Sequence, residues 1–220
     1  MLKYVIIIAL ATNLFNAECP TICNCTANVA NCTYKNLRFF PVGKYSKTIT
    51  VLDVSYNNLE TIEKLDLRNR YIIHLTHLNL SNNAIIKIDG NSFIGQRNLQ
   101  EVDLSGNNII TLPPDVLKYL PQLKCLNLSN NKKLKLTDGY PFLISDTLEV
   151  LYLEHCDLVH IPFKAIMKLK NLKVLYLSNN KIRNIHDYSG ITLNSLIDLD
   201  LSGNSLQSLR KEIISSHDDL

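Results

Sequence analysis

The chain has 220 residues, of which 46% are hydrophobic and 20% are charged, so its composition is that of a folded protein and not of a disordered segment. Its 23 lysine and arginine residues nearly balance 20 aspartate and glutamate residues, which gives a formal net charge of +3. This small charge singles out neither nucleic acid nor a membrane surface as a partner. We expect no nucleic-acid partner.

The first element in chain order is a leader. Lys3 precedes a short apolar run that ends at Ala11, and polar residues follow it. This order is typical of a signal peptide, which we expect to cover residues 1–17 with cleavage after Ala17. The run is shorter than the roughly 20 apolar residues that span a bilayer, and no later stretch is long enough. The sequence therefore predicts a secreted or extracellular chain with no transmembrane segment.

A cysteine cluster follows the leader. Four of the six cysteines lie between residues 19 and 32, at Cys19, Cys23, Cys25 and Cys32. Such a cluster forms either disulfides or a metal site, and four thiolates would suit zinc. Closely spaced thiols are normally oxidised in the secretory compartment, so the leader favours disulfides over zinc, and we expect no metal and no cofactor.

From Ile49 onward one eleven-residue phrase returns seven times. Its first, fourth, sixth and eleventh residues are mostly aliphatic, and its ninth residue is mostly asparagine. The ninth residues are separated by 26, 24, 24, 25, 24 and 24 residues, and such regular spacing indicates a repeat array. They are Asn57, Asn83, Asn107, Asn131, Cys156, Asn180 and Asn204.

The phrase has a simple physical meaning. Alternation along a strand turns its fourth and sixth side chains into the interior and its third and fifth side chains outward. The asparagine amide can satisfy backbone groups of adjoining coils that would otherwise be buried unpaired. Cys156 replaces it once, and cysteine is small and readily buried. In the fourth repeat Lys133 stands where an aliphatic residue is expected and Leu134 follows it, which predicts a local bulge.

This pattern resembles the extracellular leucine-rich-repeat family, which includes the ectodomains of Toll-like receptors, Slit proteins and neuronal leucine-rich-repeat proteins. The resemblance implies an α/β repeat solenoid, a curved horseshoe with a parallel sheet on its concave surface and an irregular or short-helical convex side. Residues 18–47 resemble the N-terminal cysteine cap of such proteins, which implies that Cys19 pairs with Cys25 and Cys23 with Cys32. Residues 48–220 then form an array of seven repeats.

The end of the array carries no cysteine cap that the sequence reveals. The last repeat starts at Leu196, and 24 residues later the sequence reaches Leu220. Terminal coils of a solenoid need a cover. We therefore expect either that the chain is a piece of a longer array or that this end docks on a partner or on a second copy.

The outward positions of the strands suggest where a partner binds. Repeats five and six carry apolar side chains at the third and fifth positions, whereas the other repeats are mostly polar or acidic there. Strands about 4.8 Å apart place these side chains in one patch, and tyrosine is favoured at interfaces. Strand preference for β-branched and aromatic residues is the alternative explanation. The predicted ligand-binding residues are Val150, Tyr152, Val174 and Tyr176.

Glycan acceptor sequences occur at Asn24, Asn31, Asn79 and Asn127. Asn79 and Asn127 are fifth-position residues, so we expect glycans there to shield repeats two to four and to leave repeats five and six open. The phrase L-N-L-S also generates such sequences as a by-product.

Two further cysteines lie within the array. Cys125 faces outward and Cys156 occupies a buried turn, so we expect both to be free thiols. An exposed free cysteine could couple two chains or be merely tolerated.

These features predict a recognition module that binds a protein ligand or co-receptor, either as a soluble binder or as part of a receptor ectodomain. The alternative is a matrix-organising protein similar to small leucine-rich proteoglycans. We expect no enzyme, because the six histidines show no H-E-x-x-H spacing, and neither a G-x-S-x-G motif nor a phosphate loop occurs.

Overall fold

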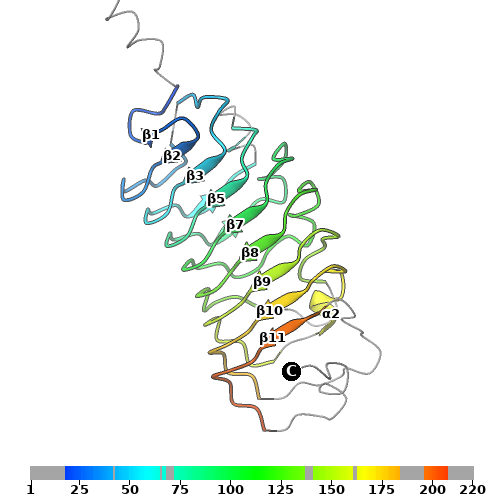
Figure 1. Ribbon diagram of the computed structural model, residues 1–220. Helices are drawn as coiled ribbons and strands as arrows, with labels where there is room; N and C mark the ends of the chain where they lie inside the picture. Colours follow the sequence, from blue (N-terminus) through cyan, green and yellow to red (C-terminus); the bar gives the residue numbers. More distant parts are fainter. Residues whose placement is uncertain are drawn as a thin grey trace, which may run out of the picture.

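The computed structural model describes residues 18–41, 43–64, 66–67, 72–136, 141–160, 163–183 and 196–207. The signal peptide predicted at residues 1–17 and the chain end from residue 208 lie outside the described residues. Nine strands form one continuous sheet that runs along the molecule, as Figure 1 shows. In spatial order they are β1 (Asn24–Cys25), β2 (Val29–Asn31), β3 (Val51–Asp53), β5 (His77–Asn79), β7 (Glu101–Asp103), β8 (Cys125–Asn127), β9 (Val150–Tyr152), β10 (Val174–Tyr176) and β11 (Asp198–Asp200).

The strands stack in the register that the repeat predicts. Apart from the antiparallel β1 and β2, neighbouring strands of this sheet pair in parallel, with equivalent repeat positions opposite each other. The fourth-position residues from Leu52 to Leu175 form one row in which no side chain is more than 2% exposed, and Leu199 ends the row half-buried. A single aliphatic interior therefore runs through all the described coils, which confirms the predicted solenoid.

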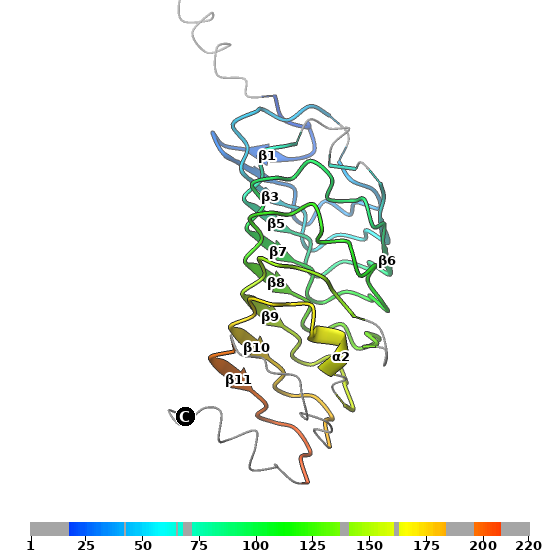
Figure 2. The ribbon, with the colours of Figure 1, turned by 90° about the vertical axis from the view of Figure 1, so that its right-hand side faces the viewer.

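The other side of the solenoid is built from shorter and less regular pieces. Figure 2 shows the strands on a gently concave side and these segments opposite them. They include a second sheet of two strands, β4 (Thr61–Ile62) and β6 (Lys87–Ile88), and the single described helical turn, α2 (Phe163–Ile166). Leu112, Val116 and Leu120 return from this wall to the core, as their spacing predicts.

The ninth-position asparagines join adjacent coils by hydrogen bonds. Asn131, which is fully buried, donates from Nδ2 to the carbonyl oxygens of Leu104 and Leu128 at 3.0 and 2.8 Å, and its Oδ1 accepts the N–H of Ile109 at 3.0 Å. Asn83, Asn107, Asn180 and Asn204 repeat this pattern. Because each amide satisfies backbone groups on two coils, it holds the coils in register as well as turning the chain.

The predicted bulge in the fourth coil is present, and Cys156 on the next coil lacks the group that would oppose it. The N–H of Lys135 donates to Ile110 at 2.8 Å, so one extra residue separates Lys135 from its coil's asparagine. Leu134 fills the core where Lys133 would have stood. In regular coils the next asparagine's Oδ1 accepts the N–H of the eleventh residue, but Cys156 has no such oxygen. The chain is therefore free to bulge at this point.

The cysteine cluster forms the first coil of the solenoid. The structure contains disulfides between Cys19 and Cys25 and between Cys23 and Cys32, which is the pairing that the family resemblance implies. Cys32 is fully buried, and Asn57 donates from Nδ2 to its carbonyl oxygen at 2.9 Å. Since β2 also pairs with β3, the cap continues the sheet instead of merely covering it.

Candidate protein-binding surface

The residue at the fifth repeat position caps most strands of the long sheet. Its side-chain oxygen accepts the N–H of the residue two places later and so caps the strand, as aspartate and asparagine commonly do. The distances lie between 2.8 and 3.0 Å. The six residues that do this are Asn31, Asp53, Asn79, Asp103, Asn127 and Asp200.

Tyr152 and Tyr176 are the departures from this rule among the eight parallel strands of the long sheet. They lie opposite each other on β9 and β10, and their rings stack with centroids 4.9 Å apart and planes 28° apart. Val150 and Val174 lie opposite each other on the same strands, and all four side chains are half-buried. The structure thus brings the four predicted residues together in one place, which we call the tyrosine patch.

Acidic side chains border the tyrosine patch. Asp198 accepts a hydrogen bond from the Tyr176 hydroxyl at 3.3 Å, and the charge of Asp198, more than burial, raises the pKa of Tyr176. Burial chiefly raises the pKa of Tyr152, with smaller contributions from Cys125, Tyr176 and nearby carboxylates. Both hydroxyls therefore stay neutral at physiological pH and can act as donors.

Glu154 is a neighbouring residue that the sequence pattern alone did not single out. Its carboxylate accepts hydrogen bonds from the hydroxyls of Ser178 at 2.9 Å and Ser129 at 3.5 Å, so it is held in place on the coil that carries Tyr152. The other seventh-position residues of the parallel strands are serine, with threonine in the cap. That regularity was the signal that could have identified it.

The four glycan acceptor sequences do not lie equally far from the tyrosine patch. Asn24 and Asn31 are exposed on the cap, and Asn79 lies on β5. Asn127, however, pairs with Tyr152 across β8 and β9. A sugar on Asn127 would therefore border the patch directly, and the expectation that glycans leave repeats five and six open stays a prediction.

We expect protein secreted from animal cells to carry a glycan on exposed Asn31 and none on half-buried Asn127. Peptide mapping by mass spectrometry, before and after enzymatic removal of N-glycans, measures this directly. A fully occupied Asn127 would mean that a glycan lies beside Tyr152, and the patch could not then be a docking surface.

The two array cysteines are free thiols, as predicted. Cys156 is buried, and Cys125 is half-buried rather than exposed, which weakens the idea that it couples two chains. Burial raises the pKa of each thiol to about 11, so both stay protonated at physiological pH. Protonated thiols are poor nucleophiles.

A second stacked aromatic pair lies far from the patch, and sequence reasoning missed it. Tyr34 and Tyr56 follow the strands of the cap and of the first repeat, with ring centroids 4.6 Å apart. Both residues have positive φ, near 54°, at the eighth repeat position, where other coils mostly have asparagine or glycine. Tyr34 and Tyr56 provide an internal comparison for any test of the tyrosine patch.

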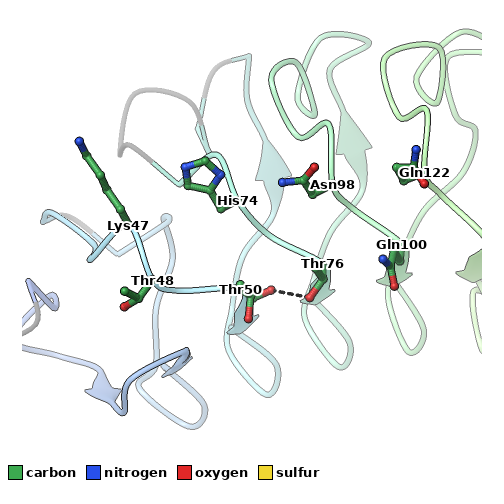
Figure 3. A pocket seen from close by; sticks show the side chains of 8 residues that line it. All are labelled: Lys47, Thr48, Thr50, His74, Thr76, Asn98, Gln100 and Gln122. Atoms are coloured by element: carbon green, nitrogen blue, oxygen red, sulfur yellow. Dashed lines mark hydrogen bonds between the residues drawn. The ribbon is translucent and has the colours of Figure 1, made fainter.

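A shallow polar hollow lies along the edge where the chain enters the first strands, as Figure 3 shows. Its lining includes Lys47, His74 and Gln122, and Thr76 there donates to the carbonyl oxygen of Thr50 at 3.1 Å. The hollow is open, and its lining contains neither a carboxylate nor a cysteine. The hydroxyl of Thr76 in this lining shares a 2.8 Å hydrogen bond with Nδ1 of His77.

Within the described residues, no group of three or more histidine, cysteine, aspartate or glutamate side chains is placed to hold a metal ion. A search of the same residues finds no helix with the length and apolar character that crossing a bilayer requires.

Stacked parallel strands, an asparagine ladder and a disulfide-bonded first coil define a capped repeat solenoid with an open sheet. A family model described as "Leucine rich repeat" matches residues 73–132 and 146–212, and a second model of that description matches residues 45–61. The chain therefore belongs to the leucine-rich-repeat family.

Comparisons with individual proteins agree with this assignment. The chain is 33% identical over 131 residues to Toll-like receptor 2 type-2 of Gallus gallus, covering 60% of this chain and 16% of the relative. It is 42% identical over 83 residues to Tsukushi of Gallus gallus, covering 38% and 22%. The chain thus spans less than a quarter of either relative. The solved structure of human 5T4 (Wnt-activated inhibitory factor 1, trophoblast glycoprotein) shares the fold, with a TM-score of 0.77 and 22% identity, over 94% of this chain and 78% of that one.

Proposed function

We propose that this chain is an extracellular recognition module that binds a protein ligand or co-receptor through the tyrosine patch on its concave sheet. One observation carries the proposal: Tyr152 and Tyr176 replace the strand-capping residues found at the same position of the other six parallel strands of the long sheet. The stacked rings contribute only about 0.5–1.5 kcal/mol to the sheet as a cross-strand pair, and the two strand caps are given up for them. Tyrosine buries a large area while keeping a polar tip, which suits a protein interface.

Several further features support an extracellular binding role. The two disulfides of the cap fit an oxidising compartment. Similarity to a Toll-like receptor and to Tsukushi favours binding over catalysis. The sheet is broad and open, which suits a macromolecule better than a small substrate. Attached glycosaminoglycan or collagen binding would instead identify the alternative, a matrix-organising protein similar to small leucine-rich proteoglycans.

The test is a double substitution, Tyr152→Ala with Tyr176→Ala. The partner is first captured from extracellular fluid of the source, identified and purified, and its dissociation constant is then measured with each variant. We expect the double substitution to weaken binding about a hundredfold or more, because stacked aromatic side chains at the centre of an interface contribute most of its affinity. The melting temperature should fall by only a few degrees, because both side chains lie on the outer face of the sheet and the lost stacking is worth about 0.5–1.5 kcal/mol.

The matched control replaces the other stacked pair, by Tyr34→Asn with Tyr56→Asn. Asparagine suits the positive φ at these positions, as it does at Asn82 and Asn130, so this variant should fold at least as well. Partner affinity should stay within about twofold of the original protein. A loss of binding in the control variant, with the Tyr152 and Tyr176 variant unaffected, would transfer the site to the other end of the solenoid.

A further inference from the structure

The concave face of the sheet is acidic, although the whole chain has a formal net charge of +3. None of the 23 lysine and arginine residues stands at the third, fifth or seventh repeat position of the coils that carry the eight parallel strands of the long sheet. His77 is the basic side chain on these positions, and it lies 3.2 Å from a carboxylate oxygen of Glu101. Six carboxylates occupy them: Asp53, Glu101, Asp103, Glu154, Asp198 and Asp200.

Carboxylates flank the tyrosine patch on more than one side. Asp198 and Asp200 on β11 lie opposite Val174 and Tyr176. Glu154 lies on the coil of Tyr152 and is held by Ser129 and Ser178. Aromatic rings and fixed carboxylates therefore share one surface. Neither the two tyrosines nor these carboxylates cap β9 or β10.

The nearest lysines in the repeat pattern offset only part of this charge. Lys124 and Lys173 occupy the second position of their coils, at the edge of the sheet, and both pair with Glu149 between them. These two ion pairs lower the pKa of Glu149 to about 2, so the group stays ionised at physiological pH. The two lysines and their glutamate form a separate row beside the patch.

We propose that the partner presents a cationic segment to this face, with one arginine or lysine side chain lying against an outer ring face of the stacked Tyr152 and Tyr176 pair and further basic side chains meeting the carboxylates of Glu154 and Asp198. This inference rests on the proposed function and names the chemistry of its partner. The faces of tyrosine rings attract cations, and a guanidinium fork matches carboxylates geometrically. Nucleic acids and sulfated glycans are anionic, as this face is, and are therefore repelled from it.

The test uses four fluorescent peptides of about twelve residues, long enough to cross the strands around the patch. Serine alternates in them with arginine, lysine, glutamine or glutamate, and binding to the disulfide-bonded chain is followed by fluorescence anisotropy. We expect the arginine peptide to bind at least about tenfold more tightly than the glutamine peptide, and the glutamate peptide not to bind. Added salt should weaken binding of the arginine peptide, because it screens the charges.

The paired variants Glu154→Gln and Asp198→Asn remove two charges from the patch, and we expect them to weaken the arginine peptide about tenfold while leaving the glutamine peptide unchanged. The control carries Glu60→Gln and Asp115→Asn, which remove the same charges from exposed sites outside these strand positions. The inference would be overturned if the patch variant and the control variant had equal effects. Equal binding of the arginine and glutamine peptides, or no binding of the arginine peptide, would overturn it as well.

The same acidic variants, measured with the purified natural partner, separate this inference from the proposed function. A partner that loses affinity with Tyr152→Ala and Tyr176→Ala, but not with Glu154→Gln and Asp198→Asn, would keep the site and refute its cationic ligand. A partner that is indifferent to both sets of substitutions would refute the site itself. If the captured partner is a second copy of this chain, sedimentation shows a dimer, and the acidic variants must weaken it for the inference to stand.

Discussion

Replacing Asn180 by alanine is expected to lower the free energy of unfolding by about 4 kcal/mol, although no ligand contact is lost. The Oδ1 atom of Asn180 accepts the N–H groups of Cys156 and Leu158 at 2.9 and 3.0 Å. Its Nδ2 donates to the carbonyl oxygens of Leu153 and Leu177, both at 2.8 Å. Truncation leaves these buried backbone groups without a partner, and each unsatisfied group costs about 1–3 kcal/mol. Denaturant unfolding followed by circular dichroism measures the loss.

Two comparison variants sharpen this experiment. Asn98→Ala makes the same truncation at an exposed side chain and should change stability by less than about 0.5 kcal/mol. Asn180→Cys should lie between the two, because a thiol can still donate weakly, as Cys156 does to Leu128, but cannot accept the two N–H groups. Equal stability of Asn180→Ala and Asn98→Ala would mean that the ladder adds nothing to the packing of the coils.

The fold could be predicted from the sequence because one physical requirement recurs in every coil. Aliphatic residues at the fourth and sixth positions and an amide at the ninth fix both the strand and the turn, and seven copies in register leave little freedom. Even the irregular coil could be anticipated from Lys133. The missing restraint could not, because it concerns an oxygen that Cys156 lacks on the next coil, 23 residues later in the chain.

The position of the candidate site could be predicted from the sequence, but the hydrogen bonding of its residues could not. Repeat spacing was enough to place Tyr152 beside Tyr176. That spacing says nothing of which side chains cap their own strands, so the contrast between the tyrosines and residues such as Asp200 emerged only from the hydrogen bonds. Likewise the cross-strand pairing of Asn127 with Tyr152 changes the expected effect of a glycan. A single repeat sequence does not reveal properties that depend on contacts with a residue of another coil.

Removing the inner cap disulfide, by Cys23→Ala with Cys32→Ala, is expected to destabilise the protein by about 4 kcal/mol. Removing the outer one, by Cys19→Ala with Cys25→Ala, should have about half that effect. The two disulfides close loops of similar length, with sequence separations of 9 and 6, so their contributions through chain entropy are similar. The difference comes from packing, because Cys23 and Cys32 are buried in the core of the first coil, whereas Cys19 and Cys25 are half-buried.

Loss of the inner disulfide should loosen the capped, N-terminal end of the solenoid and leave the end at β11 intact. The cap extends the sheet through the pairing of β2 with β3, so its release exposes the buried row at Leu52 to solvent. Coils of a solenoid contact only their neighbours, and β9 and β10 lie several coils away. Binding of an apolar dye should therefore increase, hydrogen exchange should accelerate in β2 and β3, and partner affinity at the tyrosine patch should stay within about twofold below the melting temperature. Uniform acceleration of exchange from β2 to β11 would instead show that the array unfolds as one unit and that the patch depends on the cap.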